Sequence, residues 1–193
     1  MRSFAVVIVL LLLATRAVPD ASAQTMKRIM GRDTPAHRAA LRFMRGVSLG
    51  NYLEYLPNNP ARNQSYSASD FALIRAEGFD HVRVPVAWHL YAGPAPDFTL
   101  TNSIFTSVDF MVNAALNQGL GVVLDLHGFA DFMSDPAGNQ DKFYAIWRQV
   151  GAYYSNAPSA VAFELLNEPN DNATTAVMNQ TYQIGRASCR ERV

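Results

Sequence analysis

The sequence has 193 residues, of which 49% are hydrophobic and 17% charged, and its 16 basic residues balance its 16 acidic ones. This composition fits a globular protein, and the lack of a basic excess argues against a partner of nucleic acid or a membrane surface. The single cysteine excludes a disulfide framework and a cysteine-based metal site.

The first 23 residues have the pattern of a secretory signal peptide. A short basic start precedes an unbroken apolar run over residues 4–14, and Ala21 and Ala23 form a small-x-small cleavage site. The apolar run is about half of the ~20 residues that a membrane-spanning helix needs, which argues against a membrane anchor. We expect residues 1–23 to be removed and the protein to be secreted, into the medium or a periplasm, with no membrane attachment.

The first predicted elements follow this segment in chain order. Residues 24–40 are polar and are expected to be an irregular lead-in, and residues 44–49 predict a short strand. A helix is predicted to begin at residues 67–70, where Ser and Asp are typical of a helix start, and to end at Gly78. Residues 79–86 are rich in β-branched and apolar side chains and predict a second strand.

The middle of the chain repeats this alternation. A loop rich in Gly and Pro covers residues 93–97. Apolar side chains at helical spacing between residues 104 and 116 predict a helix that Gly119 ends. Residues 120–126 form a continuous apolar run, which is typical of a strand buried on both faces.

The last predicted elements complete a series of four strand–helix units. Residues 143–154 have helical spacing, and Ala157-Pro158 ends that helix. Residues 160–166 predict a fourth strand, and residues 174–183 begin a fourth helix. Nothing in the sequence between these units indicates a domain boundary.

Serial strand–helix units predict an α/β fold with a parallel sheet. An open doubly wound sheet would usually carry a G-x-G-x-x-G turn, which this sequence lacks. We therefore favour a (β/α)8 TIM barrel, truncated after about four units, because a full barrel takes ~250 residues. Residues 24–183 are expected to be its N-terminal part. Residues 184–193 resemble the translation of a sequencing adapter and are expected to be a non-native tail.

Polar residues stand where each predicted strand ends. In a (β/α)8 barrel the active site is assembled at the carboxyl ends of the strands. Four apolar strands that all end in polar side chains indicate such a site. The residues are Asn51, Glu54, Arg83, His127, Asn167 and Glu168.

The strongest of these signals is Asn167-Glu168-Pro169 after the fourth strand. Desolvation at that position would raise the pKa of Glu168, as a general acid needs, and the Asn167 amide can hydrogen-bond a sugar hydroxyl. The alternative is an ordinary glutamate in a surface loop.

Four segments resemble the first four strands of glycoside hydrolase family 5, the cellulase family of retaining (β/α)8 glycosidases. Arg45-Gly-Val-Ser-Leu-Gly-Asn-Tyr-Leu-Glu54 resembles the first strand and His81-Val-Arg-Val-Pro85 the second. Leu124-Asp-Leu-His-Gly128 resembles the third, and Phe163-Glu-Leu-Leu-Asn-Glu-Pro169 the fourth.

The resemblance implies retaining hydrolysis of a β-glycosidic bond by two carboxylates about 5–5.5 Å apart. It makes Glu168 the acid/base beside Asn167, His127 a substrate contact, and Arg83 the arginine that steadies the nucleophile. The family's nucleophile follows the seventh strand, which this sequence does not reach. We therefore expect the chain as given to lack hydrolase activity.

Several residues have more than one interpretation. Without a nucleophile to hold, Arg83 is expected to pair with Asp125 or Glu164, although these two also fit a structural polar layer. Glu54 fits either a substrate contact or a loop anchor.

Aromatic side chains near the strand ends are candidates to line a sugar cleft, and packing of the loops is the alternative for each. They are Trp88, His89, Tyr91, Phe129, Phe132, Tyr52 and Tyr55. The histidines show no metal-ligand spacing, so no metal or cofactor is expected.

The leading functional hypothesis is an endo-β-1,4-glucanase that acts on β-glucan or a related polysaccharide and is a monomer when full length. An exo-β-1,3-glucanase and a β-mannanase are alternatives within the family. A non-catalytic carbohydrate-binding barrel is the alternative outside enzymes, and the residue after strand 7 would distinguish it.

Overall fold

The computed structural model describes residues 35–190 of the chain, which divides into two units, Met1–Leu41 and Arg42–Val193. The described part of the first unit is helix α2 (Pro35–Ala40). This corrects the expectation that residues 24–40 are irregular throughout. A proline at the first helical position and alanines after it favour a helix. The predicted signal peptide, residues 1–23, lies outside the described residues.

The second unit contains strands and helices in the predicted alternation. Its elements are β1 (Gly46–Ser48), α3 (Ala68–Ala76), β2 (His81–Val86), the 3-10 helix η1 (Trp88–Leu90), α4 (Asn102–Asn117), β3 (Gly121–Leu126), α5 (Ala130–Ser134), α6 (Pro136–Tyr153), β4 (Val161–Glu164) and α7 (Thr175–Arg190).

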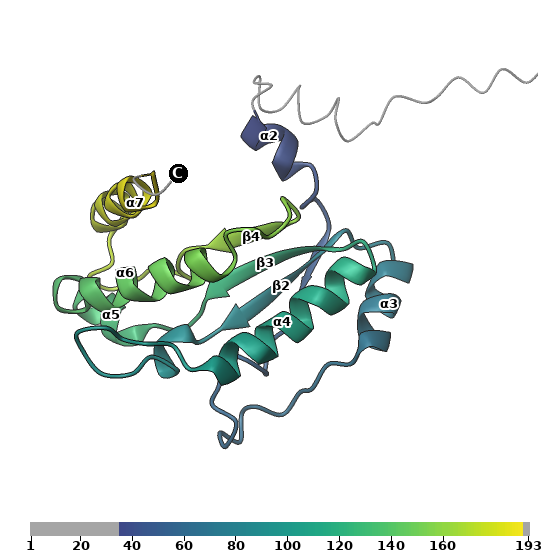
Figure 1. Cartoon of the computed structure of the whole chain (residues 1–193), viewed down its shortest axis with the longest axis horizontal. Helices are drawn as coiled ribbons and strands as arrows, with labels where there is room; N and C mark the ends of the chain where they lie inside the picture. Colours follow the sequence, from purple (N-terminus) through teal and green to yellow (C-terminus); the bar gives the residue numbers. More distant parts are fainter. Residues whose placement is uncertain (1–34, 191–193) are drawn as a thin grey trace, which may run out of the picture. The chain divides into compact units, whose positions relative to one another are not determined.

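The four strands form one parallel sheet in the order β1-β2-β3-β4. Each strand therefore lies beside the next one in the chain, whereas a doubly wound sheet reverses its order at a switch point. Right-handed crossovers between neighbours in this order place the helices on one side of the sheet, and Figure 1 shows α4 and α6 along one side. This is the arrangement of consecutive units in a (β/α)8 barrel.

The helix-facing side of the sheet is the hydrophobic core of this unit. Alternate residues of β2 and β3 point to it, among them Val82, Val84, Val122 and Leu124, and all four are 0% exposed. Met111 of α4 is likewise fully buried. Burial of each such side chain contributes about 1.5–3 kcal/mol, so this face holds the sheet and helices together.

The opposite side of the sheet is built in layers across the strands. In the lowest layer Gly46, His81 and Gly121 are aligned by the strand register. A Cβ atom added at Gly46 would clash with the His81 ring, and one at Gly121 would lie 2.9 Å from Phe43 Cε1. At the amino ends of the strands Gly46 therefore makes room for the His81 imidazole, and Gly121 makes room for the Phe43 ring that packs edge-on against that imidazole.

Several short or terminal stretches differ from the predicted elements. Helices η1 and α5 lie in segments between the predicted elements, and each is under two turns, too short for a periodic pattern. Helix α6 begins about two turns before Phe143, because Asp135 caps it and Pro136 occupies its first turn. Strand β4 is shorter than predicted. Helix α7 continues to Arg190, and the rest of the suspected tail lies outside the described residues.

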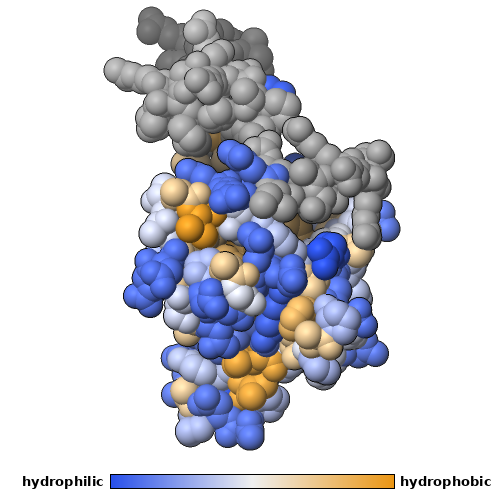
Figure 2. Space-filling model, turned by 90° about the vertical axis from the view of Figure 1, so that its left-hand side faces the viewer, coloured by the Kyte–Doolittle hydropathy of each residue, from blue (hydrophilic) through white to orange (hydrophobic). Residues whose placement is uncertain are grey.

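The carboxyl ends of the strands point to the left in Figure 1, and Figure 2 views the molecule from that side. Hydrophilic residues cover most of this face, and its hydrophobic patches are small and separate (Figure 2). No helix in the described part of the chain is long and apolar enough to cross a membrane.

Gln149 of α6 fastens the loop between η1 and α4. Its Oε1 accepts a hydrogen bond from the Leu100 backbone N–H at 2.8 Å, and its Nε2 donates to the Phe98 carbonyl at 3.0 Å. One amide side chain thus satisfies a donor and an acceptor of the same loop, as a strand neighbour would.

We expect Gln149→Ala to lower the free energy of unfolding by about 1–2 kcal/mol, because it leaves the Leu100 N–H and the Phe98 carbonyl without their partner. Denaturant titration followed by circular dichroism measures the change. Arg148→Ala, at the exposed preceding position, is the matched control and should change stability little. Equal stabilities of the two variants would contradict the anchoring role.

Candidate active site

The candidate site lies at the carboxyl ends of the four strands, on the side of the sheet away from the core. Strand register places Asp125 of β3 directly beside Glu164 of β4, and Arg83 of β2 lies on the same side one layer below. The side chain of Arg83 extends from that lower layer to both carboxylates.

Arg83 joins three neighbouring strand ends. Its Nε and Nη2 donate to the two carboxylate oxygens of Glu164 at 2.7 and 2.8 Å, a bidentate contact. Nη2 is also 2.8 Å from Asp125 Oδ2 and donates to Asn167 Oδ1 at 2.8 Å. The sequence left open whether Arg83 pairs with Asp125 or Glu164, and in the structure it pairs with both.

Asp125 lies at the buried centre of the site. Its side chain is 0% exposed, and Oδ2 is 2.7 Å from His127 Nδ1 in addition to the Arg83 contact. Its other oxygen, Oδ1, is buried and has no hydrogen-bond partner among the residues that the structure describes. Burial raises the pKa of Asp125, while the bond to His127 and the charge of Arg83 oppose this rise.

These carboxylates favour the charged forms of Arg83 and His127. The hydrogen bond that His127 donates to Asp125 is the main cause that raises the pKa of His127 above 6.5, and the negative charge of Glu54 adds to it. The bond with Glu164 is the main cause that raises the pKa of Arg83, and the charges of Asp125, Glu164 and Glu168 contribute. Glu54 and Glu168 therefore act electrostatically on the same cluster.

The Arg83 contact determines how Asn167 is oriented. A guanidinium only donates hydrogen bonds, so the atom of Asn167 that faces it must be the amide oxygen. The Nδ2 group then faces away from the guanidinium as a hydrogen-bond donor. The backbone N–H of Asn167 donates to the Leu126 carbonyl at 3.0 Å, which fixes this residue against β3.

Glu168 is presented on a strained turn. Its φ is 43°, in the left-handed region that residues other than glycine rarely adopt. The proline that follows restricts the backbone of Glu168 as well. Strain of this kind is concentrated at functional sites. The side chain is exposed, so the desolvation that the sequence suggested for Glu168 is not found in this chain.

Glu54 anchors the loop that follows β1. Its carboxylate accepts hydrogen bonds from the backbone N–H groups of Asn51 at 2.7 Å and Tyr52 at 3.4 Å. Of the two interpretations, the structure therefore supports the loop anchor. Asn51 has a φ of 60°, which asparagine tolerates better than most residues, and it is exposed at the rim.

Trp88 is a correction to the sequence interpretation. It is 0% exposed and packs against Phe105 of α4, with ring centroids 5.6 Å apart, so its face is not open to a sugar. Phe129 is also fully buried and stacks on His89 at 4.8 Å. Burial and the nearby charge of Lys142 lower the pKa of His89 to about 4. For these side chains the alternative, packing of the loops, describes the structure.

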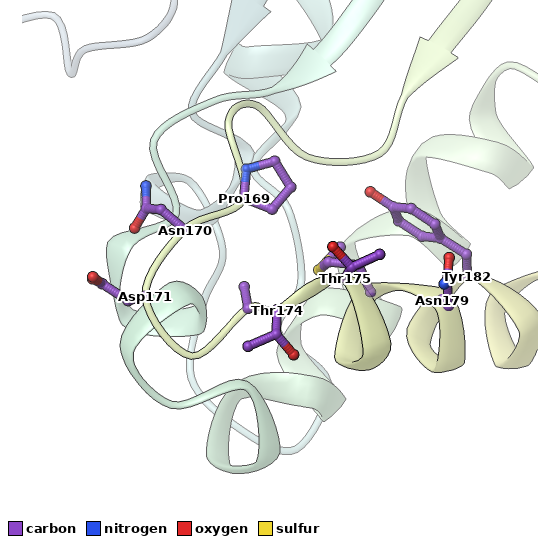
Figure 3. Close-up of a pocket in the computed structure, with 9 residues that line it drawn as sticks. Pro169, Asn170, Asp171, Thr174, Thr175, Asn179 and Tyr182 are labelled. Atoms are coloured by element: carbon purple, nitrogen blue, oxygen red, sulfur yellow. The ribbon is translucent and has the colours of Figure 1, made fainter.

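A hollow of about 500 Å³ lies next to Glu168, between the loop after β4 and the start of α7. Figure 3 shows Asn170 and Asp171 on the loop side and Thr175, Asn179 and Tyr182 on the helix side. Polar groups on both sides suit a hydrated surface beside the acid candidate. In the described part of the chain, no group of three or more His, Cys, Asp or Glu side chains is placed to hold a metal ion.

The sequence indicated Asp125 and Glu164 as partners of Arg83, because strand parity places Asp125 on the side of His127 and Glu164 on the side of Glu168. It did not indicate that both carboxylates contact Arg83 at once. The structure brings together Arg83, His127, Asn167 and Glu168, with Glu54 and Asn51 at the neighbouring rim, and it excludes Trp88. This arrangement offers an exposed carboxylate, an oriented amide donor and a fixed cation, which suits general acid catalysis on a polar substrate.

Comparisons with known proteins agree with this geometry. The family model of cellulases, glycosyl hydrolase family 5, matches residues 45–188. Endoglucanase A of Paenibacillus barcinonensis is 31% identical over 84% of this chain and 44% of its own length. Crystal structures of Cel5A from Thermotoga maritima are 31% identical with a TM-score of 0.75, in complex with cellobiose (83% of this chain, 54% of that chain) and with mannotriose (80% and 50%). The chain thus spans about half the length of these relatives.

We expect Asp125→Asn to lower the pKa of His127, because the carboxylate that stabilises the imidazolium is removed while burial remains. NMR titration of the histidine ring protons measures it. Because the folded-state pKa of His127 is raised, its protonation stabilises the fold below pH 6.5, and this contribution is lost as the pH rises through the folded pKa.

The matched control is Asp97→Asn, at an exposed position in the loop between η1 and α4. It should leave the titration of His127 unchanged. A His127 titration that is the same in Asp125→Asn and in the wild type would show that the Asp125–His127 bond does not set the protonation of this histidine.

Proposed function

Because the chain belongs to the cellulase family, glycosyl hydrolase family 5, we propose that residues 24–183 are the N-terminal part of the catalytic barrel of a secreted, retaining β-glycosidase. Residues 1–23 act as the signal for export, and residues 184–193 are a tail that is not native to the protein. The whole enzyme completes the barrel with further strands and works as a monomer without a cofactor.

The observation that carries this proposal is the placement of Glu168. It stands exposed at the carboxyl end of β4, beside an Asn167 whose amide is oriented by Arg83 at 2.8 Å. In the proposed reaction Glu168 protonates the oxygen of the leaving sugar while a second carboxylate attacks the anomeric carbon. Glu168 then takes a proton from the water that releases the glycosyl group, and the Asn167 Nδ2 group donates to a sugar hydroxyl.

The second carboxylate comes from a strand beyond the four described here. In a retaining enzyme it lies about 5–5.5 Å from the acid/base. Arg83 lies close enough to Glu168 for the two charges to interact, so it is placed to keep such a nucleophile ionised. His127, held by Asp125, faces the same space as a donor to substrate.

The substrate that we propose is a β-1,4-glucan, cleaved within the chain. The endoglucanase of P. barcinonensis and the cellobiose complex of T. maritima Cel5A support this choice. A β-mannan is the second candidate, because a T. maritima Cel5A structure is in complex with mannotriose. An exo-β-1,3-glucanase and a non-catalytic carbohydrate-binding barrel are the remaining alternatives.

We predict that the purified chain of 193 residues does not hydrolyse β-glucan, since retaining hydrolysis needs two carboxylates that act on the substrate. Of the carboxylates at the site, Asp125 and Glu164 are held by Arg83 and Glu54 by backbone N–H groups, which leaves Glu168 as the one candidate among the described residues. Release of reducing sugar from carboxymethylcellulose measures this. Turnover that persists in the purified chain and disappears in Glu168→Gln would contradict the need for a further strand.

We predict that the chain, fused to the C-terminal half of T. maritima Cel5A to complete the barrel, gains hydrolase activity. In that fusion Glu168→Gln should lower kcat on carboxymethylcellulose by about 10²–10⁴-fold, because general acid catalysis is lost. On an aryl cellobioside with a good leaving group, Glu168→Gln should lower the rate of the first, bond-breaking step by a smaller factor. The reason is that such a leaving group departs with little need of protonation.

Glu77→Gln, an exposed glutamate that caps the C-terminus of α3, is the matched control and should retain full activity. Equal losses of Glu168→Gln on both substrates would argue against an acid role. A folded fusion that is retained on cellulose without hydrolysis would favour the binding barrel.

A further inference from the structure

The aromatic side chains in the loops at the carboxyl ends of the strands, here called the rim, differ in whether packing within the fold already occupies them. Trp88, Phe129 and Phe132 are fully buried, and Tyr91 is 9% exposed with its hydroxyl bonded to the Tyr55 carbonyl at 3.2 Å. These rings are occupied by packing and cannot offer a face to a ligand.

Tyr52 and Tyr66 are also occupied. The guanidinium of Arg62 lies 4.5 Å from the centroid of the Tyr52 ring, and Tyr66 meets the same ring edge-on at 5.8 Å. Tyr66 additionally donates its hydroxyl to the Gly50 carbonyl at 2.8 Å. Both rings therefore hold the loop after β1 in place.

Tyr55 is the exception among the rim tyrosines. Its side chain is half-buried, yet it forms no hydrogen bond and no ring contact with the residues that the structure describes, and it is not packed against the core cluster. The fold thus leaves one aromatic side chain of this rim without a structural task.

The backbone that carries Tyr55 is nevertheless fixed on several sides. Its carbonyl accepts the Tyr91 hydroxyl, and its N–H donates to the Tyr52 carbonyl at 3.4 Å. The Glu54 carboxylate closes the turn just before it, and the Leu53 carbonyl accepts the Ala87 N–H at 3.0 Å. A ring on a fixed backbone loses little conformational entropy on binding, which favours recognition.

The position of Tyr55 suits a sugar chain that extends from the catalytic end of the rim. Its neighbour Glu54 acts electrostatically on His127, so the loop borders the site. Three strand spacings separate β1 from β4, about 14 Å along the sheet, which is more than one sugar ring. A chain that starts at Glu168 would reach Tyr55 only after several rings.

We propose that Tyr55 is a substrate-binding residue that stacks on the apolar face of a pyranose ring several units from the bond that Glu168 cleaves, and that it thereby favours longer oligosaccharides. This inference rests on the proposed function, since it assumes a sugar chain that runs along the rim. The hydroxyl group takes no part, because the contact is made by the face of the ring.

Titration calorimetry of the 193-residue chain with cellobiose and with cellotetraose tests the proposal. The wild type should bind cellotetraose more tightly than cellobiose. Tyr55→Ala should weaken the binding of cellotetraose by about three- to tenfold and leave the binding of cellobiose unchanged. Tyr55→Phe keeps the ring and should bind like the wild type.

Leu90→Ala, which removes an exposed apolar side chain from the neighbouring η1, is the matched control and should not change either affinity. Equal affinities of the wild type and Tyr55→Ala for cellotetraose would overturn the inference, as would an equal loss in Tyr55→Phe. A wild type that binds neither sugar overturns it too. Failure of the proposed function is read separately, from the hydrolysis assay of the completed barrel.

Discussion

The rim of the sheet depends on one guanidinium. Arg83 of β2 binds Asp125 at the end of β3 and both Glu164 and Asn167 at the end of β4, so one cation joins three neighbouring strands. Moving an ion out of water costs several kcal/mol unless it is paired, and Asp125 is fully buried. The position of each partner is therefore conditional on the others, and the cluster exists only because parallel register sets Asp125 beside Glu164.

The charges of this cluster do not cancel within the four strands. Two carboxylates, Asp125 and Glu164, face the single charge of Arg83. His127 donates a hydrogen bond to Asp125, and this bond together with the excess negative charge raises the pKa of His127. One oxygen of Asp125 is still unpaired among the described residues, although buried carboxylates normally accept more than one hydrogen bond. Asp125 Oδ1 could therefore accept a hydrogen bond from a donor on a further strand of the proposed barrel.

Rigid scaffold and variable loop have separate tasks in this fold. The strand ends orient Asn167 through Arg83 and present Glu168 on a strained turn. The loop after β1 is tied down by Glu54 and by aromatic contacts, and it carries Tyr55 as an unused ring. Chemistry at the strand ends and selectivity in the loops is the usual division of labour in a (β/α)8 barrel.

The sequence by itself determined the four strand–helix units and the polar residues at the strand ends. These features are local, because apolar periodicity and the residue after a strand are read within a few positions. It could not determine η1 and α5, whose lengths are below the period of any pattern. Only the tertiary structure decided that Arg83 holds both Asp125 and Glu164, that Trp88 is buried and that Glu168 is exposed. The physical reason is that pairing and burial depend on strand register and on side chains from distant segments, which no local pattern records.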